Sequence, residues 1–273
     1  MGDWRRIARR PGMTLERNIP AMTDTQPNIG RVNWFRFAAP PAAYALAGQL
    51  VPWLAAVAAV LTILGLYLGL FIAPTDFQQG DAYRIVFVHV PAAWLSMLLY
   101  LAMAGWAGVG LVWNTRVSAM MAQALAPTGA LFTVLALLTG ALWGRPTWGA
   151  WWVWDARLTS ELLLLFLYMG YLALRAGFDD VRRADRASAL LALIGVVNVP
   201  VIYFSVQWWN TLHQGATIRL THTSMAPSML AALLLTTFGL WAYAGATVLR
   251  RLRCILLERE RRSAWVAALG ATA

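Results

Sequence analysis

The sequence contains no lysine and few charged residues of any kind. Charged residues make up 12% of the 273-residue chain, against about 25% in soluble domains, whereas hydrophobic residues make up 60%. All 22 basic residues are arginines. The single cysteine, Cys254, excludes an intrachain disulfide and leaves no thiol pair for redox or metal chemistry. This composition excludes an ordinary soluble domain and favours a membrane protein.

Several functional signatures are also missing. No nucleotide-binding loop, nucleophile elbow or metalloprotease motif is present, so no ATP-driven step is expected from this chain. The net charge of +10 comes from arginines that are dispersed around apolar segments, which argues against a nucleic-acid partner. No apolar segment follows the first arginine cluster, so residues 1–42 are predicted to be a polar, arginine-rich tail and not a signal peptide.

Six apolar runs follow this tail, each close to the roughly 17–25 residues that cross a bilayer as a helix. Lipid cannot satisfy free backbone groups, so helices are the expected structure. The sequence therefore predicts an all-α integral membrane protein, a bundle of six transmembrane helices over residues 43–249, with a C-terminal tail at 250–273. Asn198 and Pro200 lie inside the fifth run, where proline is expected to kink the helix. The expected spans are 51–72, 88–112, 124–143, 158–174, 189–206 and 227–248.

The arginines are distributed unevenly between the two sides of the predicted bundle. Eighteen of the 22 lie in the two tails and in the second and fourth connections between spans. The positive-inside rule then places both termini in the cytoplasm and the other three connections outside. These outer connections run over about 73–87, 144–157 and 207–226, and they hold the remaining arginines: Arg84, Arg145, Arg157 and Arg219.

Five tryptophans fall within residues 143–154, in the second outer connection. An aromatic belt would scatter one or two over each membrane interface, whereas this density suits a large planar ligand. Trp148, Trp151, Trp152 and Asp155 have the spacing of one face of a short helix, although Gly149 weakens helix propensity. We therefore expect a tryptophan-rich loop or a short interfacial helix at the outer face. Membrane anchoring by the tryptophans is the alternative.

All three histidines are predicted to lie on the same outer face. Two neutral imidazoles, such as those of His89 and His213, can bind a haem iron from opposite sides. A zinc site would need further Cys, Asp or Glu ligands, which this face hardly offers. Taken singly, either histidine could instead be a hydrogen-bonded or solvated residue. His222 has no aromatic neighbours and is interpreted as a polar loop residue.

Outer arginines are natural partners for the two propionates of a haem, because the guanidinium fork matches a carboxylate. Arg84 and Arg157 are in place for this, or they could form local ion pairs with Asp81 and Asp155. Asp155 could also cap the fourth span. Glu161 is the only acid inside a predicted span, which makes it a functional candidate.

The segment Trp148–Glu161 resembles the tryptophan-rich WWD signature of haem-handling proteins in cytochrome c assembly. Within that group, the sequence is most similar to the CcmC family of six-span proteins. The resemblance extends from about residue 33 to about residue 260, and motifs recur in the expected order. The supporting segments are Tyr83–Pro91, Phe178–Asp180, Gly195–Pro200 and Gln207–Gly215.

The resemblance implies that haem is held, non-covalently as haem b in transit, at the periplasmic face of the inner membrane. It implies that His89 and His213 are axial ligands and that Arg84 and Arg157 support binding. The haem would be passed to the periplasmic haem chaperone CcmE, with the small membrane protein CcmD and the transporter subunits CcmA and CcmB as further partners. The implied function is delivery of haem to the chaperone, and an enzymatic role is not the expectation. The loop residues implied in haem binding are Trp148, Trp151, Trp152, Trp154 and Asp155.

Three other functions are compatible with parts of this pattern. A b-type cytochrome for electron transfer would also use two histidines, but usually on facing helices within the spans. A haem lyase acting directly on apocytochrome c shares the WWD signature, but generally has a large periplasmic domain. A transporter that moves haem through its own bundle would need a polar pathway, and the spans offer few polar groups beyond Asn198 and Glu161.

Overall fold

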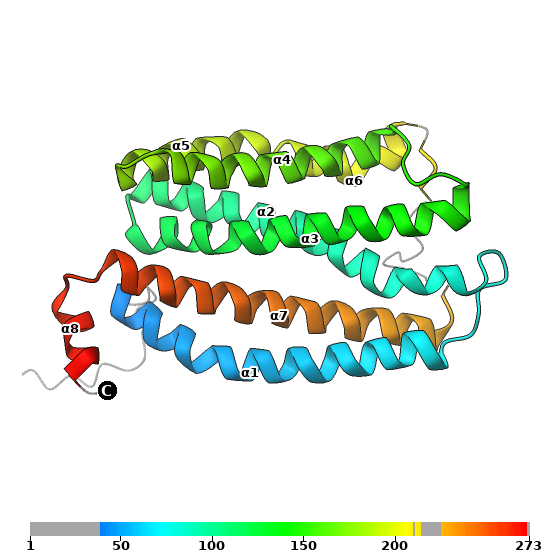
Figure 1. The fold of residues 1–273 in the computed structure, drawn as a ribbon, viewed down its shortest axis with the longest axis horizontal. Coiled ribbons are helices and arrows are strands. Elements are labelled where there is room, and N and C mark those ends of the chain that lie inside the picture. Colours follow the sequence, from blue (N-terminus) through cyan, green and yellow to red (C-terminus); the bar gives the residue numbers. More distant parts are fainter. Residues whose placement is uncertain (1–38, 210, 214–224, 272–273) are drawn as a thin grey trace, which may run out of the picture. The chain divides into compact units, whose positions relative to one another are not determined.

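The computed structural model describes residues 39–209, 211–213 and 225–271, and every regular element in these ranges is a helix (Figure 1). A short π-helical turn, η2, and a 3₁₀ turn, η3, lie between the first two α-helices. In chain order the elements are α1 (Pro40–Tyr67), η2 (Leu68–Ile72), η3 (Asp81–Ile85), α2 (Val86–Trp113), α3 (Arg116–Trp148), α4 (Ala156–Gly177), α5 (Val181–Gly195), α6 (Asn198–Trp208), α7 (Pro227–Arg259) and α8 (Ala264–Ala271).

Six helical stretches in the described part of the chain are long and apolar enough to cross a membrane. Each predicted span falls inside one of them, so the all-α, six-span fold is confirmed. The helices extend beyond the apolar runs because their hydrogen bonding continues into polar sequence: α7, for example, reaches Arg259. The six stretches are Pro40–Ile72, Asp81–Trp113, Arg116–Trp148, Ala156–Gly177, Val181–Trp208 and Pro227–Arg259.

The spans pack as neighbouring pairs. Figure 1 shows α1 beside α7, α2 beside α3, and α4 beside α5 and α6, with the α2–α3 pair between the other two groups. The α1–α7 pair meets through small residues, because a Cβ on Gly65 would come within 2.4 Å of Thr236 Oγ1, and one on Gly239 within 2.4 Å of Thr62 Oγ1. Such close backbone approach is typical of helix pairs in membranes.

The side of α1 that faces away from the rest of the bundle exposes large apolar side chains. Trp53 is 75% exposed and Ile63 is 67% exposed, and both belong to an almost wholly apolar helix. Exposure of this apolar surface to water would cost free energy, whereas contact with lipid chains would not. The face therefore fits contact with the bilayer.

The fifth span is broken where the sequence predicts a kink. Helix α5 ends at Gly195 and α6 begins at Asn198, two residues before Pro200. The buried Asn198 side chain donates through Nδ2 to the Ser160 carbonyl of α4 at 2.9 Å. This bond holds α6 against α4 near the start of α4.

The alternative of a short interfacial helix through Trp148–Asp155 is wrong. Helix α3 continues through the first tryptophans to Trp148 and ends at Gly149, whose φ of 78° lies in the left-handed region. The backbone then runs without helical structure to Asp155, which caps α4. Glycine ends the helix here because it adopts positive φ at no steric cost. The tryptophan-rich segment is thus the end of a helix followed by a loop.

The predicted tails are only partly covered by the structure. Residues 1–38 of the expected N-terminal tail lie outside the described residues, and α1 has already begun at Pro40. The end of α7 and α8 occupy the predicted C-terminal tail up to residue 271. The division of the chain at residues 42 and 249 stays a prediction.

Candidate functional site

His89 lies in the first turns of α2, and its ring is fixed by α3. Nδ1 is 3.1 Å from the Ala136 carbonyl oxygen and 3.0 Å from Thr139 Oγ1. The Thr139 hydroxyl donates its own proton to the Leu135 carbonyl at 2.6 Å, so it can only accept from His89. Both partners therefore require a proton on Nδ1, which leaves Nε2 of the neutral ring with a free lone pair. That tautomer is the one that binds a metal through Nε2.

His213 lies in the segment after α6, and it approaches the same region from another side. Its ring is tilted against Trp148, with 5.0 Å between ring centroids. Its Nδ1 is 3.7 Å from Asp155 Oδ2, and neither atom has a hydrogen-bond partner among the described residues. Burial, followed by the Arg157 guanidinium, lowers the pKa of His213 to about 4, against the opposing effect of the Asp155 carboxylate. The imidazole is therefore neutral at pH 7, as a metal ligand must be.

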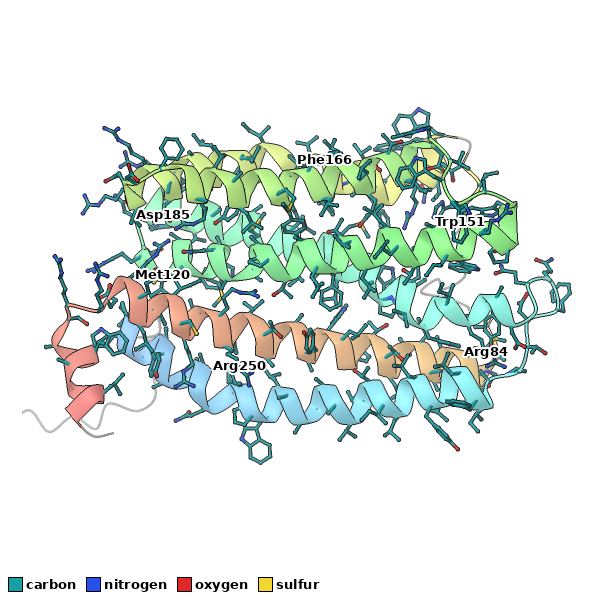
Figure 2. The ribbon with its side chains drawn as sticks, in the orientation of Figure 1. Arg84, Met120, Trp151, Phe166, Asp185 and Arg250 are labelled. Carbon is teal, nitrogen blue, oxygen red and sulfur yellow. The ribbon has the colours of Figure 1, made fainter. Side chains whose placement is uncertain are left out.

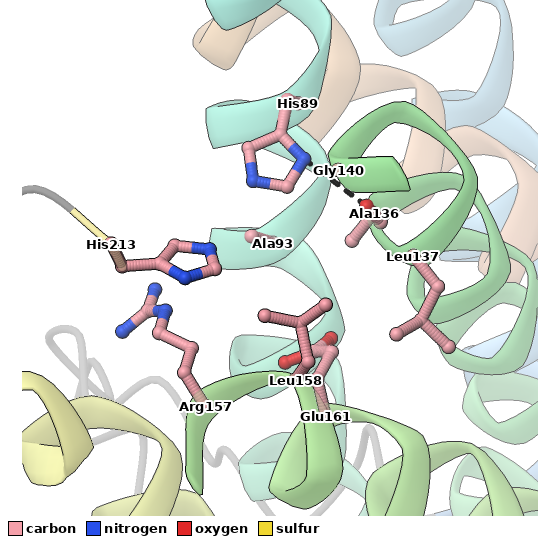
Figure 3. Close-up of a pocket in the computed structure, with 9 residues that line it drawn as sticks. All are labelled: His89, Ala93, Ala136, Leu137, Gly140, Arg157, Leu158, Glu161 and His213. Atoms are coloured by element: carbon pink, nitrogen blue, oxygen red, sulfur yellow. Dashed lines mark hydrogen bonds between the residues drawn. The ribbon is translucent and has the colours of Figure 1, made fainter. Parts of the chain in front are cut away.

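The two histidines line one small pocket, together with residues of α3 and α4 (Figure 3). Arg157, near the start of α4, extends its guanidinium beside His213 in Figure 3 and donates to the Ile202 carbonyl of α6 at 3.1 Å. The cavity measures about 30 Å³, which is room for only a few water molecules. It is too small to contain a macrocycle, so a haem held between the two imidazoles would extend out through its open side.

Glu161 closes the inner end of this pocket. It stands one turn after Arg157 on α4, its side chain is buried, and it accepts a 2.7 Å hydrogen bond from the Ser96 hydroxyl of α2. No ion pair within 4 Å neutralises it among the described residues. An acid buried at this depth is costly, so a functional role is the first hypothesis.

Two tryptophans contact the histidines of the pocket, and the five tryptophans do not form one flat platform. Trp143 meets the His89 ring edge to face, with centroids 5.6 Å apart, while Trp148 contacts His213. Trp152 and Trp154 form an edge-to-face pair at 5.4 Å. Trp151 is 56% exposed and Trp154 is 75% exposed, so both offer free ring surface at the end of the bundle.

The structure separates Arg84 from the other predicted site residues. Its Nε donates to Asp81 at 2.9 Å and its Nη1 to the Gly69 carbonyl at 2.6 Å, and it does not line the pocket. The local pair is therefore the arrangement seen for Arg84. Arg157 makes no such pair with Asp155, whose Oδ1 instead accepts from Leu158 N as the cap of α4.

Some residues of the site were not singled out by the sequence. Thr139 carries no motif, and its contact with His89 depends on how α2 and α3 pack. Trp143 belongs to the tryptophan cluster but not to the predicted ligand-binding set, although its ring is the one against His89. His222 lies outside the described residues.

Comparison with known proteins identifies the family. The family model described as "Heme exporter protein C" (CcmC) matches residues 33–267. The chain belongs to the haem exporter protein C family. A relative from Escherichia coli (strain K12), named Heme exporter protein C, is 49% identical over 86% of this chain and 95% of its own length. Relatives of the same name from Haemophilus influenzae and Paracoccus denitrificans are 47% and 39% identical, over 86% and 79% of this chain and 96% and 93% of their own lengths.

Membership of this family confirms the resemblance inferred from the WWD segment and the motifs around it. With the six apolar helices, it makes the chain a multi-pass protein of the inner membrane. The matched region contains the whole of the pocket, from His89 to His213.

Proposed function

We propose that the chain holds haem at the periplasmic face of the inner membrane and hands it to the chaperone CcmE during cytochrome c maturation. The coarse role, haem export for cytochrome c maturation, follows from the family. The observation that carries the finer proposal is the pairing of His89 and His213 at one pocket. Both are neutral-ring candidates for ligation, one by its hydrogen bonds and the other by its lowered pKa.

In this proposal, haem is the cargo and this chain supplies its binding groups. His89 Nε2 and a nitrogen of His213 take the two axial positions. The exposed rings of Trp151 and Trp154, with Trp148 against His213, cover the apolar macrocycle by stacking. Arg157 is the described arginine placed to meet a propionate at the pocket. Arg84 would act from farther away, because it lies in the 3₁₀ turn η3 that precedes α2.

The open side of the pocket suits delivery. A cavity of about 30 Å³ cannot enclose a macrocycle, so the haem edge away from Arg157 would remain accessible to a second protein. An electron-transfer cytochrome would instead need a closed site that retains its haem. Proximity and orientation of the haem edge would be the contribution of this chain, with CcmE supplying the group that reacts. CcmD and the transporter subunits CcmA and CcmB are the further partners proposed.

The orientation proposed has both termini in the cytoplasm. It is supported by the arginine distribution and by the position of the pocket at the end of the bundle that carries few arginines. Reporter fusions would test it: alkaline phosphatase joined after residue 259 should be inactive, and joined after residue 150 active. The reverse pattern would overturn the orientation.

The haem site is tested by absorption spectra of the full-length protein, purified after expression with and without CcmE. Wild type should show a bis-histidine haem spectrum, and His89→Ala and His213→Ala should each change it. His222→Ala is the matched control and should leave the spectrum unchanged. Wild-type spectra in both pocket variants would overturn the ligand assignment.

Handover is tested separately, by following haem bound covalently to CcmE on denaturing gels. Covalent attachment of haem to CcmE should require this chain. The haem-bearing CcmE band should be lost with His89→Ala. Equal labelling without the chain would overturn the handover. Formation of cytochrome c without CcmE would favour the lyase alternative.

A further inference from the structure

A second, larger cavity lies at the other end of the α2–α3 pair. It measures about 540 Å³, within the size range of small-molecule sites. His89 and Gly110 stand near opposite ends of α2, about 30 Å apart at 1.5 Å per residue, so the two cavities are well separated. In Figure 2, Asp185, which lines the larger cavity, and Trp151 of the tryptophan-rich loop lie at opposite ends of the bundle.

Small residues contributed by three helices line much of the cavity. The end of α2, the start of α3 and the first turns of α5 form its walls. Asn114, in the left-handed conformation with φ of 55°, turns the chain between α2 and α3 beside it. The small side chains of the lining are Ala107, Gly110, Ala119, Ala122 and Ala189.

Unpaired positive charge lines this cavity. Arg182 and Arg186 are one turn apart on α5, so they project from the same face of that helix. Both are exposed, and neither side chain has an ion pair or hydrogen bond among the described residues. Arg116, at the start of α3, adds a third guanidinium, which pairs with Glu260 at 2.9 Å while remaining 75% exposed.

Asp185, the one acid among the described lining residues, does not neutralise these arginines. Asp185 is engaged by Arg175 of α4 and by Arg259 of α7, at 3.0 Å for the latter. Its two oxygens are therefore already used by cations outside the cavity. The pair formed by Arg182 and Arg186 is left with uncompensated charge, which attracts an anion.

The lining of the same cavity also contains apolar residues. Leu111 and Tyr171 line it together with the alanines of α2 and α5. A ligand that fits both kinds of lining residue has an anionic head and an apolar body, and basic pockets between transmembrane helices are recognised ways of holding acidic lipid head groups. Zwitterionic head groups carry their own cation, which the unpaired arginines disfavour.

We propose that this cavity is a binding site for a phosphate-bearing anion, supplied by the head group of an acidic phospholipid, with Arg182 and Arg186 on the phosphate and Leu111 and Tyr171 against the glycerol and acyl region. The site is independent of the haem pocket. A bound lipid would tie the α2–α3 pair to α5 at the arginine-rich end of the bundle. Free phosphate is the other source of the same chemistry, and it would meet the arginines alone.

The test uses the full-length protein in detergent, with bound lipid measured by native mass spectrometry after adding phosphatidylglycerol or phosphatidylcholine. We expect wild type to retain phosphatidylglycerol preferentially. The double variant Arg182→Gln with Arg186→Gln should lose about 25-fold in retention, at about fivefold for each arginine near a phosphate. The matched control, Arg183→Gln with Arg262→Gln, removes the same charge from exposed positions outside the cavity and should retain the lipid.

Equal loss in both double variants would overturn the site, because the lipid would then respond only to overall charge. Ala119→Leu narrows the cavity and keeps every charge, so it covers the case in which the double variant fails to fold. It should also reduce retention, and unchanged retention would overturn the cavity. Sodium phosphate distinguishes the sources: failure to displace the lipid supports the phospholipid, whereas displacement at low millimolar phosphate overturns the lipid assignment in favour of free phosphate.

Discussion

Asp155 uses its two carboxylate oxygens for two tasks, and two substitutions separate them. Oδ1 caps α4 by accepting from Leu158 N at 2.8 Å, and Oδ2 faces His213 Nδ1 at 3.7 Å. Asparagine caps a helix as well as aspartate does, but it carries no charge. Asp155→Asn should therefore keep the cap and lose the charge beside His213, whereas Asp155→Ala should lose both.

The expected magnitudes differ for the two tasks. Losing the cap costs about 1 kcal/mol, which corresponds to roughly 2–4 °C in melting temperature for a chain of this size. A carboxylate hydrogen-bonded to a metal-binding histidine contributes about 10–100-fold in affinity, and the 3.7 Å between Asp155 Oδ2 and His213 Nδ1 is longer than a hydrogen bond, so we expect a loss of about tenfold. Asp155→Ala should lower both the melting temperature and the haem affinity. Asp155→Asn should lower the affinity alone.

Both effects can be measured on the purified chain. Thermal unfolding of the haem-free protein in detergent reports the cap, and titration with haem, followed by the absorption spectrum, reports the affinity. Wild-type affinity in Asp155→Asn would refute the orienting role of the carboxylate. A lowered melting temperature in Asp155→Asn, equal to that of Asp155→Ala, would refute the separation of the two oxygens.

Three further predictions address the pocket and the bundle. Thr139→Val removes the hydroxyl that accepts from His89 and should weaken haem binding about tenfold in titrations, without changing the melting temperature. Glu161→Gln removes an acid that lines the pocket, so redox titration should show a higher haem midpoint potential. A tenfold change in the ratio of ferric to ferrous haem corresponds to about 59 mV. An unchanged potential would argue for a structural role of Glu161. Gly65→Ala places a Cβ within 2.6 Å of the α7 backbone and should destabilise the fold by about 1–3 kcal/mol in thermal unfolding, whereas Gly105→Ala, with no atom within 4 Å of its Cβ, is the matched control.

The membrane architecture could be predicted from the sequence because it depends on a strong local signal. A run of about 20 apolar residues has one stable form in lipid, so each of the six spans was visible without its neighbours. The break before Pro200 was visible for the same reason, since proline lacks the amide that continues a helix. The extra length of the helices was not visible, because their polar ends are held by contacts such as Arg259 with Asp185.

The sequence singled out three haem-binding candidates that line the pocket, but not their geometry. The histidines and Arg157 stood out by type and by position on one predicted face. The tautomer of His89 did not, because it depends on Thr139 and Ala136 of another helix. The spacing of Trp148, Trp151 and Trp152 suggested one helical face, but the helix ends at Gly149, whose φ is positive, so Trp151 and Trp152 lie outside it.

Helix α3 connects the two candidate ligands physically. Its residues Ala136 and Thr139 hold His89, and Trp148 at its end contacts His213. Any shift of the last turns of α3 would therefore move the supports of both imidazoles together, so the positions of the two rings are not independent. In the proposed haem complex, a rigid end of α3 would hold both imidazoles in position to bind iron. A displaced end would weaken both iron–nitrogen bonds at once. Under the proposed function, one movement of α3 would therefore release both ligands together.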